Sequence, residues 1–415
     1  MILKIRNIIE QIRKGEVPEG YIKTVSGLAP ADWNQYTYGA IYTKRKEPGN
    51  EELPLLTVSI HSGVSDGEVD EDDLPKKIKR IEDKSQYKKA VSGDLVFNMM
   101  RAWQGAIGTV RTTGMVSPAY IVAKPNDKVY PLFMDYYTRT LQMINQIDRQ
   151  SYGVTDFRKR LYWDSFAPIS CVLPSIEEQK KIATILTTQD KVIELKEKSL
   201  TEKQRQKKYL LQQLLTGQKR LPGFSGEWKT ERLGKLFLER KETNCEGLEM
   251  LAITGTQGII PRKELDLKDN SSNDKSKYLR VCVGDIGYNT MRMWQGVSAY
   301  SNYDGIVSPA YTILKPNSSI NAKYFAYLFK LPEIIFLFYR FSQGLVDDTR
   351  NLKYENFKKI KVFYPPDVKE QTAIAEILST ADREIDLLRQ NIEQEKQKKK
   401  ALMQLLLTGI VRVKT

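Results

Sequence analysis

The chain contains one segment twice, and this internal repeat constrains its fold more than any other feature. Residues 93–126 and 284–317 align without a gap at an offset of 191 residues, and both contain MR-x-WQG followed by Ser-Pro-Ala-Tyr. A self-match of this quality indicates a duplicated folding unit. Two similar modules on one chain can act at two places at once.

The repeat covers almost the whole chain. Matching positions lie 195 residues apart at Trp33 and Trp228, and 192 apart at Gln179 and Gln371. The offset falls from 195 to 191 after Gly63, so the first copy has a loop that is four residues longer. This charged loop, within residues 65–84, is expected to be exposed to solvent.

Composition excludes several classes of protein. The 415 residues fit two to four domains, and 41% hydrophobic content allows ordinary cores. No run of 18 apolar residues is present, so no membrane span is expected, and charges interrupt the N-terminal segment too soon for a signal peptide. Three cysteines without a CxxC pair predict a reduced, cytoplasmic protein, and with a single histidine they argue against a transition-metal site.

The net charge of +14, with a pI near 9.3, makes the chain basic. A basic excess attracts polyanions such as nucleic acids and speeds the encounter with them. The same charge also serves solubility in proteins that bind no nucleic acid, so charge alone leaves both interpretations open.

Each copy begins with a mixed segment that predicts an α+β domain. Short β-branched and aromatic runs such as YIVAKP and YTILKP are broken by Gly, Asn, Asp and Pro, which is typical of strands and turns. A helical stretch follows in each copy, over residues 133–147 and 323–341.

A long helix ends each copy. Apolar residues recur at alternating spacings of four and three residues from Ile182 to Leu214 and from Ile374 to Leu406, with polar residues at several central positions. This heptad pattern predicts a coiled coil of about 50 Å, with Gly217 and Gly409 terminating the two helices. If the helices pair antiparallel about a pseudo-dyad, facing residue numbers sum to about 588.

That register places Asp190 opposite Lys399 and Lys207 opposite Asp382. The alternative is that these lysines extend into solvent and pair with nothing. The N-terminal residues 8–15 loosely resemble the end of the long helix. They either complete the repeat before the first globular domain or form an ordinary amphipathic cap.

The helix motifs carry a resemblance to a known family. PSIEEQKKIATIL and PPDVKEQTAIAEIL at the helix starts, each followed by LLTG at the end, resemble conserved regions of the specificity (S) subunits of type I restriction–modification systems. The resemblance covers the whole chain. The mixed segments resemble the target-recognition domains of that family.

The resemblance implies a fold of class α+β, with two pseudo-symmetric target-recognition domains separated by two long helices that form an antiparallel coiled coil. The expected parts are an N-terminal helix (1–20), the first recognition domain (21–173), the central helix (174–217), the second recognition domain (218–364) and the C-terminal helix (365–415).

The resemblance also implies a function. Each recognition domain would read half of a bipartite site in double-stranded DNA, while the helices set the spacing and dock two modification subunits for adenine N6 methylation. S-adenosylmethionine and ATP are expected on partner subunits, restriction subunits can join, and no cofactor or catalysis is expected here. No [NDS]PP[YFW] or GxxxxGK[ST] motif is present, which agrees with a subunit that is not an enzyme.

Three pairs of segments are candidates for DNA contact. Arginine suits guanine or phosphate, glutamine suits adenine, and small polar residues suit either. The MR-x-WQG pair supplies Arg101, Gln104, Arg292 and Gln295. The second pair supplies Tyr152, Thr155, Arg158, Arg160, Gln343, Arg350 and Asn351, and the third supplies His61, Ser62, Thr256 and Gln257.

Structural roles compete with these assignments. Trp103 and Trp294 are expected to be buried in a turn, with Ser-Pro-Ala-Tyr as a structural element. Because both copies carry MR-x-WQG, the two half-sites are predicted to share bases in inverted orientation. Two other functions stay open, namely the specificity component of a related bipartite-site system and a structural adaptor that binds no DNA.

Overall fold

The computed structural model describes residues 2–25, 27–65, 67, 83–153, 158–245, 247–255, 257–265 and 274–413. It divides into two compact units. Unit 1 comprises Met1–Leu195 together with Ile392–Thr415, and unit 2 comprises Lys196–Asn391. Both long helices run through the two units, so each unit contains a part of each helix.

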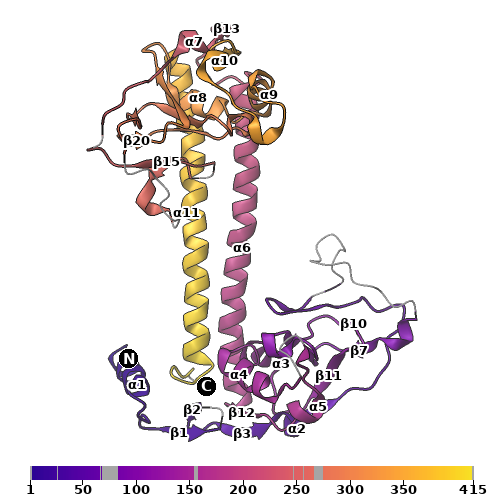
Figure 1. Cartoon of the computed structure of the whole chain (residues 1–415). Helices are drawn as coiled ribbons and strands as arrows, with labels where there is room; N and C mark the ends of the chain where they lie inside the picture. The colour runs from indigo at the N-terminus through magenta and orange to yellow at the C-terminus, as the bar shows by residue number, and fades with distance from the viewer. Residues whose placement is uncertain are drawn as a thin grey trace. The chain divides into compact units, whose positions relative to one another are not determined.

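Unit 1 starts with the N-terminal helix and continues through short strands into the first long helix (Figure 1). Its elements are α1 (Ile2–Arg13), β1 (Tyr21–Thr24), β2 (Gly27–Pro30), β3 (Asn34–Thr37), α2 (Tyr38–Ile41), β4 (Tyr42–Lys44), β5 (Val58–Ser59), β6 (Gly63–Val64), η2 (Lys84–Gln86), β7 (Lys88–Ala90), β8 (Leu95–Asn98), η3 (Ala102–Gln104), β9 (Ile107–Thr109), β10 (Gly114–Val116), β11 (Tyr120–Pro125), α3 (Pro131–Tyr137), α4 (Leu141–Gln150), α5 (Trp163–Phe166), β12 (Ser170–Leu173) and the start of α6 (Ile176–Leu215).

Unit 2 repeats this order of elements. They are β13 (Lys229–Arg232), α7 (Leu233–Leu236), β14 (Phe237–Glu239), β15 (Leu251–Ile253), β16 (Ile259–Pro261), η5 (Arg262–Glu264), β17 (Leu279–Val281), β18 (Ile286–Asn289), η6 (Met293–Gln295), β19 (Ser298–Tyr300), β20 (Gly305–Val307), β21 (Tyr311–Pro316), α8 (Ala322–Leu328), α9 (Pro332–Phe341), η7 (Asp347–Thr349), α10 (Tyr354–Phe357), β22 (Lys361–Tyr364) and most of α11 (Val368–Leu406). The segment from β8 to β12 thus has an equivalent from β18 to β22.

A four-stranded antiparallel sheet lies at the centre of each unit. Its order is β4-β11-β8-β9 in unit 1 and β14-β21-β18-β19 in unit 2. The registers match, because Tyr120 pairs with Asn98 in one sheet and Tyr311 pairs with Asn289 in the other. The aromatic and aliphatic core beside each sheet includes residues of the long helices, such as Ile182 and Ile374. Each long helix is therefore part of a domain core as well as part of a helix pair.

The helical stretch predicted after each sheet is two helices and not one. In unit 1 the break comes before α4, whose N-cap Thr140 accepts a hydrogen bond from the backbone N–H of Met143. In unit 2 the break falls at Leu331, because Pro332 cannot continue the preceding helix and instead occupies the first turn of α9. The predicted helical stretches are confirmed, but the sequence did not reveal the breaks, since both stretches keep an apolar pattern across them.

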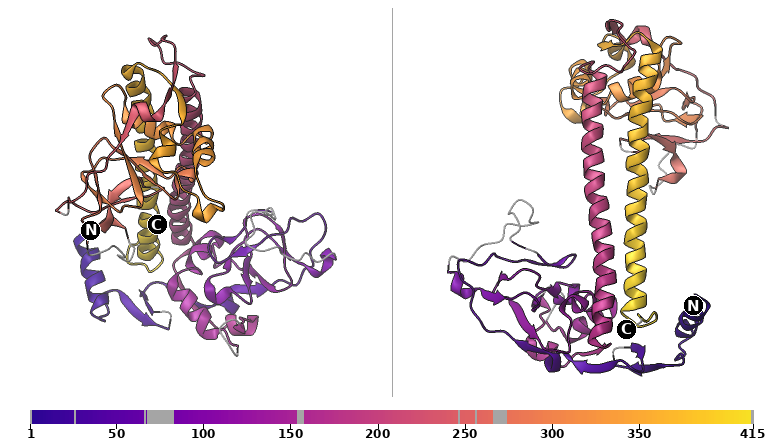
Figure 2. Two further views of the ribbon diagram at one scale, coloured as in Figure 1. Left: turned by 45° about the horizontal axis from the view of Figure 1, so that its top comes forward. Right: turned by 180° about the vertical axis from the view of Figure 1, so that it is seen from behind.

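The two long helices end as predicted. Gly217 and Gly409 have φ values of +73° and +71°, a left-handed conformation that glycine adopts without the strain a β-carbon would bring. In each unit a part of α6 lies beside a part of α11, and Figure 2 shows the pair from behind as well. In unit 2, Lys196, Lys203 and Lys207 of α6 contact Asn391, Glu384 and Asp382 of α11, respectively, so the numbers rise on one helix as they fall on the other and the helices run antiparallel.

The predicted charge register is confirmed within both units. Lys399 Nζ lies 2.5 Å from Asp190 Oδ1 in unit 1, and Lys207 pairs with Asp382 in unit 2. The other polar heptad positions are also paired. Gln189 donates to Glu395, Lys196 to Asn391 and Lys203 to Glu384. The alternative, that the lysines extend unpaired into solvent, is wrong.

The end of each long helix packs on a tryptophan at the start of a globular part. A β-carbon on Gly409 would lie 3.1 Å from the Trp33 ring, and one on Gly217 would lie 3.3 Å from the Trp228 ring. The C-terminal end of α11 therefore occupies the place before the first globular part that residues 8–15 were considered to fill. Those residues belong to α1 and the turn after it.

The predicted α+β class, with two globular parts of like topology and an antiparallel pair of long helices, is confirmed. The domain boundaries stay a prediction, because the compact units divide the long helices near their middles. Among the described residues, no helix is both long and apolar enough to cross a membrane.

Candidate nucleic-acid interface

The MR-x-WQG motif forms the same tight loop after the central strand of both sheets. The side-chain oxygen of Asn98 accepts a hydrogen bond from Met100 N at 3.0 Å, and Asn289 does the same for Met291 N. The tryptophan three residues after that methionine lies in a short 3₁₀ turn, η3 or η6, which glycine ends with φ of +101° at Gly105 and +80° at Gly296.

The tryptophan holds the loop together. Trp103 Nε1 donates to Met100 O and Trp294 Nε1 donates to Met291 O, each at 3.0 Å, and both rings are half-buried. A β-carbon on Gly296 would lie 2.7 Å from Ile335 of α9, so the loop packs closely on that helix. The structural role expected for the two tryptophans agrees with this geometry.

The charged and amide side chains of the loop lie at its surface. Arg101, Gln104, Arg292 and Gln295 are exposed, and among the described residues their side chains form no hydrogen bond or ion pair. An arginine and a glutamine three residues apart on a rigid turn, free to donate, can address phosphate oxygens or base edges.

The second candidate segment adjoins this loop in each unit. Leu161 N donates to Met99 O at 2.8 Å, and Leu352 N donates to Thr290 O at 2.9 Å. Lys159 lies 5.2 Å from the Trp103 ring, and the equivalent contact in unit 2 is made by Arg350 at 6.0 Å from the Trp294 ring. The fold thus brings together two candidate segments that are about 50 residues apart in sequence.

The individual residues of this segment differ in their availability. Tyr152, Arg158, Arg160 and Gln343 are exposed, while Thr155 lies outside the described residues. Arg350 stacks on Tyr339, with its guanidinium carbon 4.1 Å from the ring centroid, and it also approaches Asp347. Asn351 donates its side-chain amide to Thr349 O. Arg350 and Asn351 therefore already have internal partners.

The third candidate is the turn that carries His61 and Ser62 in unit 1 and Gln257 in unit 2. In unit 1, a β-carbon on Gly105 would lie 3.6 Å from Ile60 O, so the turn that carries exposed His61 and Ser62 adjoins η3. In unit 2, Gln257 is exposed and its backbone N–H donates to Thr254 Oγ1 at 2.9 Å, while Thr256 lies outside the described residues. Gln257 also lines a groove that includes Lys207 and Arg389, so it faces the helices of unit 2.

One residue that sequence reasoning missed is Lys330. Its ammonium donates to Gly296 O at 2.7 Å and to Ser298 O at 2.6 Å, so it fixes the end of the MRMWQG loop. Burial lowers the pKa of Lys330 to about 8, with a smaller contribution from Lys207. The equivalent residue in unit 1, Arg139, instead bonds to Asp135. No local pattern distinguishes Lys330 from a surface lysine.

This burial predicts a pH dependence. The pKa of Lys330 is lower in the folded than in the unfolded chain, so between about pH 8 and 10.5 the unfolded chain binds more protons and stability rises with pH. Relative to a Lys330→Met variant, wild-type unit 2 should gain up to about 3 kcal/mol in unfolding free energy across that window. Urea denaturation of the wild type and the variant at pH 7 and pH 10 measures this difference. The contributions of all other titrating groups are the same in both proteins and cancel when the two free energies are subtracted. A difference that does not change with pH would contradict it.

Sequence reasoning also missed the apolar tip of the second segment in unit 2. Leu345 is 99% exposed and Val346 is 59% exposed, and they follow the backbone bridge between Gln343 and Asn351. Apolar side chains can contact the methyl group of thymine. Their position inside a polar segment was visible in the sequence, but their exposure was not.

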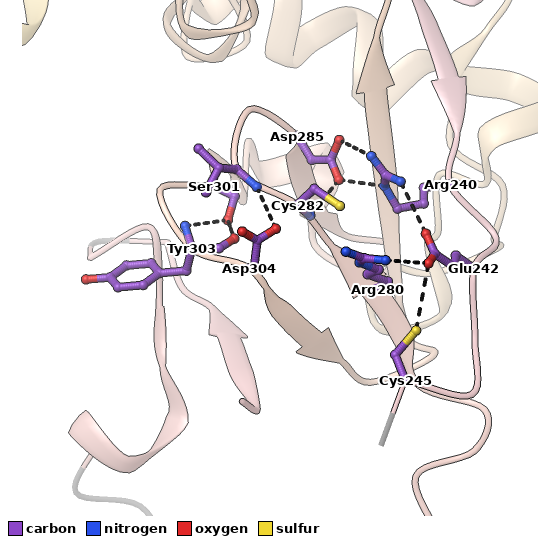
Figure 3. Close-up of polar contacts among 10 residues, drawn as sticks. Arg240, Glu242, Cys245, Arg280, Cys282, Asp285, Ser301, Tyr303 and Asp304 are labelled. Atoms are coloured by element: carbon purple, nitrogen blue, oxygen red, sulfur yellow. Dashed lines mark hydrogen bonds and ion pairs between the residues drawn. The ribbon is translucent and has the colours of Figure 1, made fainter. Parts of the chain in front are cut away.

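The Gly-Asp pair that precedes β8 and β18 in the two copies has a structural role. Asp94 and Asp285 are both buried, and each forms a two-bond ion pair with the arginine that directly follows β4 or β14: Arg45 Nε at 2.6 Å and Arg240 Nε at 2.7 Å. Figure 3 shows the second pair, with Glu242 bridging Arg240 and Arg280. Hydrogen bonding to the carboxylate raises the pKa of both arginines, Arg45 and Arg240.

No metal-binding group emerges from the described residues, in which no three His, Cys, Asp or Glu side chains are placed to hold an ion. Burial raises the pKa of the Cys171 thiol to about 12, so this thiol stays protonated. The expectation that no cofactor binds stays a prediction.

Comparisons with known proteins converge on one family. Residues 226–397 match the model described as the type I restriction modification DNA specificity domain. Over 96% of its length the chain is 24% identical to a protein of Methanocaldococcus jannaschii, covering 98% of that protein, which is described as a candidate MjaX type I restriction enzyme specificity subunit.

Two solved structures share the fold. One is the S subunit of a type I restriction–modification system from M. genitalium, with 14% identity, a TM-score of 0.54, and coverage of 92% of this chain and 97% of that chain. The other comes from work on complex assembly and conformational transition of the type I R-M system, with 17% identity, a TM-score of 0.52, and coverage of 92% and 99%.

Proposed function

We propose that this chain, which belongs to the specificity-subunit family of type I restriction–modification systems, reads a bipartite site in double-stranded DNA, one half with each globular part. The observation that supports this most is the exposed arginine and glutamine on the same loop of each unit, Arg101 with Gln104 and Arg292 with Gln295, whose side chains have no hydrogen bond or ion pair among the described residues. A net charge of +14 favours the same partner.

The proposal assigns partners to other parts of the chain. Two modification subunits would dock on the long helices and methylate adenine N6 with S-adenosylmethionine, and ATP-driven restriction subunits can join them. In this proposal the chain contributes recognition and positioning, and the partner subunits contribute the chemistry. Within each unit, the long helices pack into the domain core, which holds the surface on which such partners would dock in place.

The function is tested by mapping N6-methyladenine across the genome with and without this gene. The expected result is methylation at one bipartite motif that disappears when the gene is removed. If methylation does not change, the proposal fails. Purified chain should also bind DNA with an affinity that falls steeply with salt, whereas a structural adaptor would show no such dependence.

The loop arginine of unit 2 allows a sharper prediction. Arg292→Ala should lower affinity for the cognate site about 10- to 100-fold, the value of one bidentate base contact, and relax one position of one half-site only. Arg292→Lys is the matched variant, because it keeps the charge for a phosphate but loses the two-pronged geometry for guanine. Competition binding with single-base variants of the site measures both. Unchanged affinity and preference in Arg292→Ala would remove this loop from the interface.

A further inference from the structure

A carboxylate on a long helix joins three elements in unit 1. Tyr136 of α3 donates its hydroxyl to Asp190 Oδ2 of α6 at 2.6 Å, and Lys399 of α11 lies 2.5 Å from Asp190 Oδ1. The ammonium also lies 5.5 Å from the centroid of the Tyr136 ring. One globular part and both helices thus meet at a single aspartate.

Unit 2 contains the same cluster with the helices exchanged. Tyr327 of α8 donates to Asp382 Oδ2 of α11 at 2.7 Å, and Lys207 of α6 pairs with the other oxygen. Lys207 also lies 6.0 Å from the centroid of the Tyr327 ring. The same three residue types in the same roles, drawn from two different helices, point to a shared function of the cluster.

Both clusters are built to hold their geometry. Each aspartate uses both oxygens, one for a hydroxyl and one for an ammonium, and such charge-assisted bonds are stronger than neutral ones. The lysine and aspartate side chains are about a quarter to a third exposed, so water screens them less than a surface pair. Burial, aided by the aspartate, raises the pKa of Tyr136 and Tyr327 well above the usual value, so both remain donors at neutral pH.

The globular part of each unit is also attached to a long helix at a second point, which lies nearer the start of that helix. The side-chain oxygen of Gln179 accepts from Tyr130 N at 2.8 Å, and that of Gln371 accepts from Asn321 N at 2.7 Å. In each unit this glutamine comes 11 residues before the aspartate, which is about 16 Å along a helix. A globular part attached to its helix at one point can rotate about that point. Two attachment points this far apart fix the angle between the globular part and the helix.

We propose that the clusters Tyr136–Asp190–Lys399 and Tyr327–Asp382–Lys207 are joints that hold each recognition domain at one angle to its helices and so restrict the spacing between half-sites that the protein accepts. This inference rests on the proposed function. These are positioning residues, which touch no DNA base. Loss of a joint leaves the bases read in each half-site unchanged and widens only the range of spacer lengths that the protein accepts between them.

The test is a series of DNA sites whose half-sites are unchanged and whose spacer is shortened or lengthened by one base pair. The substrate is the methylation complex with the full chain, and the variant is Tyr136→Phe combined with Tyr327→Phe, which removes only two hydroxyls. The preference for the natural spacer over the altered ones should fall about tenfold, because a hydrogen bond to a charged group no longer opposes the tilt. The bases read in each half-site should not change.

Tyr137→Phe is the matched control. The Tyr137 hydroxyl accepts a bond from Val172 N inside the unit 1 core and makes no contact with the helix carboxylate. The control should keep the wild-type spacer preference, and a control that relaxes equally would overturn the proposal. If the phenylalanine variant does not fold, Lys207→Met combined with Lys399→Met is the alternative. It removes the ammonium partner of each aspartate instead of the hydroxyl partner.

The failures of the two proposals are distinguishable. Wild-type protein that methylates no bipartite site contradicts the proposed function. Wild-type protein that methylates one, with an unchanged spacer preference in the folded joint variants, contradicts only the joints.

Discussion

Replacing Arg412 with alanine is expected to lower the unfolding free energy of unit 1 by about 3–5 kcal/mol. Arg412 donates to both oxygens of Glu178 at 2.9 and 2.8 Å and to both oxygens of Asp32 at 2.7 and 2.8 Å. The Glu178 side chain is only 3% exposed, so its carboxylate would lose its guanidinium partner without regaining water. Asp32 is 63% exposed and would simply be hydrated.

Two further variants test this explanation of the Arg412 effect. Arg412→Lys keeps a charge but cannot make two parallel bonds, and it should fall between wild type and alanine. Combining Arg412→Ala with Glu178→Met removes the orphaned carboxylate and should recover most of the loss. Hydrogen exchange of unit 1 peptides, followed in urea, gives the local free energies. A loss below about 1 kcal/mol for Arg412→Ala would mean that water reaches Glu178 once the arginine is gone.

Arg240→Ala should destabilise unit 2 by a similar amount, about 3–5 kcal/mol. Arg240 bonds Asp285 through Nε at 2.7 Å and through Nη2 at 3.0 Å, and Asp285 is 2% exposed (Figure 3). Without Arg240 the Asp285 carboxylate keeps one backbone donor, Cys282 N. A buried carboxylate with a single neutral donor is unstable.

Arg280→Ala is the control for this prediction. Arg280 pairs with Glu242 in the same cluster, but the two side chains are 37% and 41% exposed. Water screens a pair this exposed, so its loss should change the unfolding free energy of unit 2 far less than the loss of Arg240 does. Urea denaturation of both variants, with hydrogen exchange to locate the effect in unit 2, should separate them clearly. Equal losses would show that burial of Asp285 does not control the stability of this cluster.

Much of the helical architecture could be predicted because helix patterns are local. The heptad spacing of Ile182 to Leu214 defines one face of a helix regardless of what it packs on. Once two such faces pair antiparallel, the register follows from counting residues, which is why the Asp190–Lys399 contact was predicted from sequence and is confirmed. The two sheets share a strand order because the two copies of the repeat share the short-range pattern that defines the strands.

The candidate interface was predicted only in part. The MR-x-WQG loop was found through repetition, and its neighbour containing Arg350 was found through its composition. Side chains from other elements decide that Arg350 stacks on Tyr339, whereas Arg292 has no side-chain bond within the described part of the chain. The assignments for DNA contact therefore stay predictions, but the structure ranks Arg101 and Arg292 as more available than Arg350.

By itself, the sequence determined that this protein is a duplicated α+β chain with two long helices, because periodicity and repetition are properties of neighbouring residues. The tertiary structure alone decided which polar groups share a carboxylate. Arg412 reaches Glu178 across 234 residues of chain, and Tyr136 reaches Asp190 across 54. Such pairings arise when folding brings donors from distant elements to one carboxylate, and no local pattern records which donors will meet there.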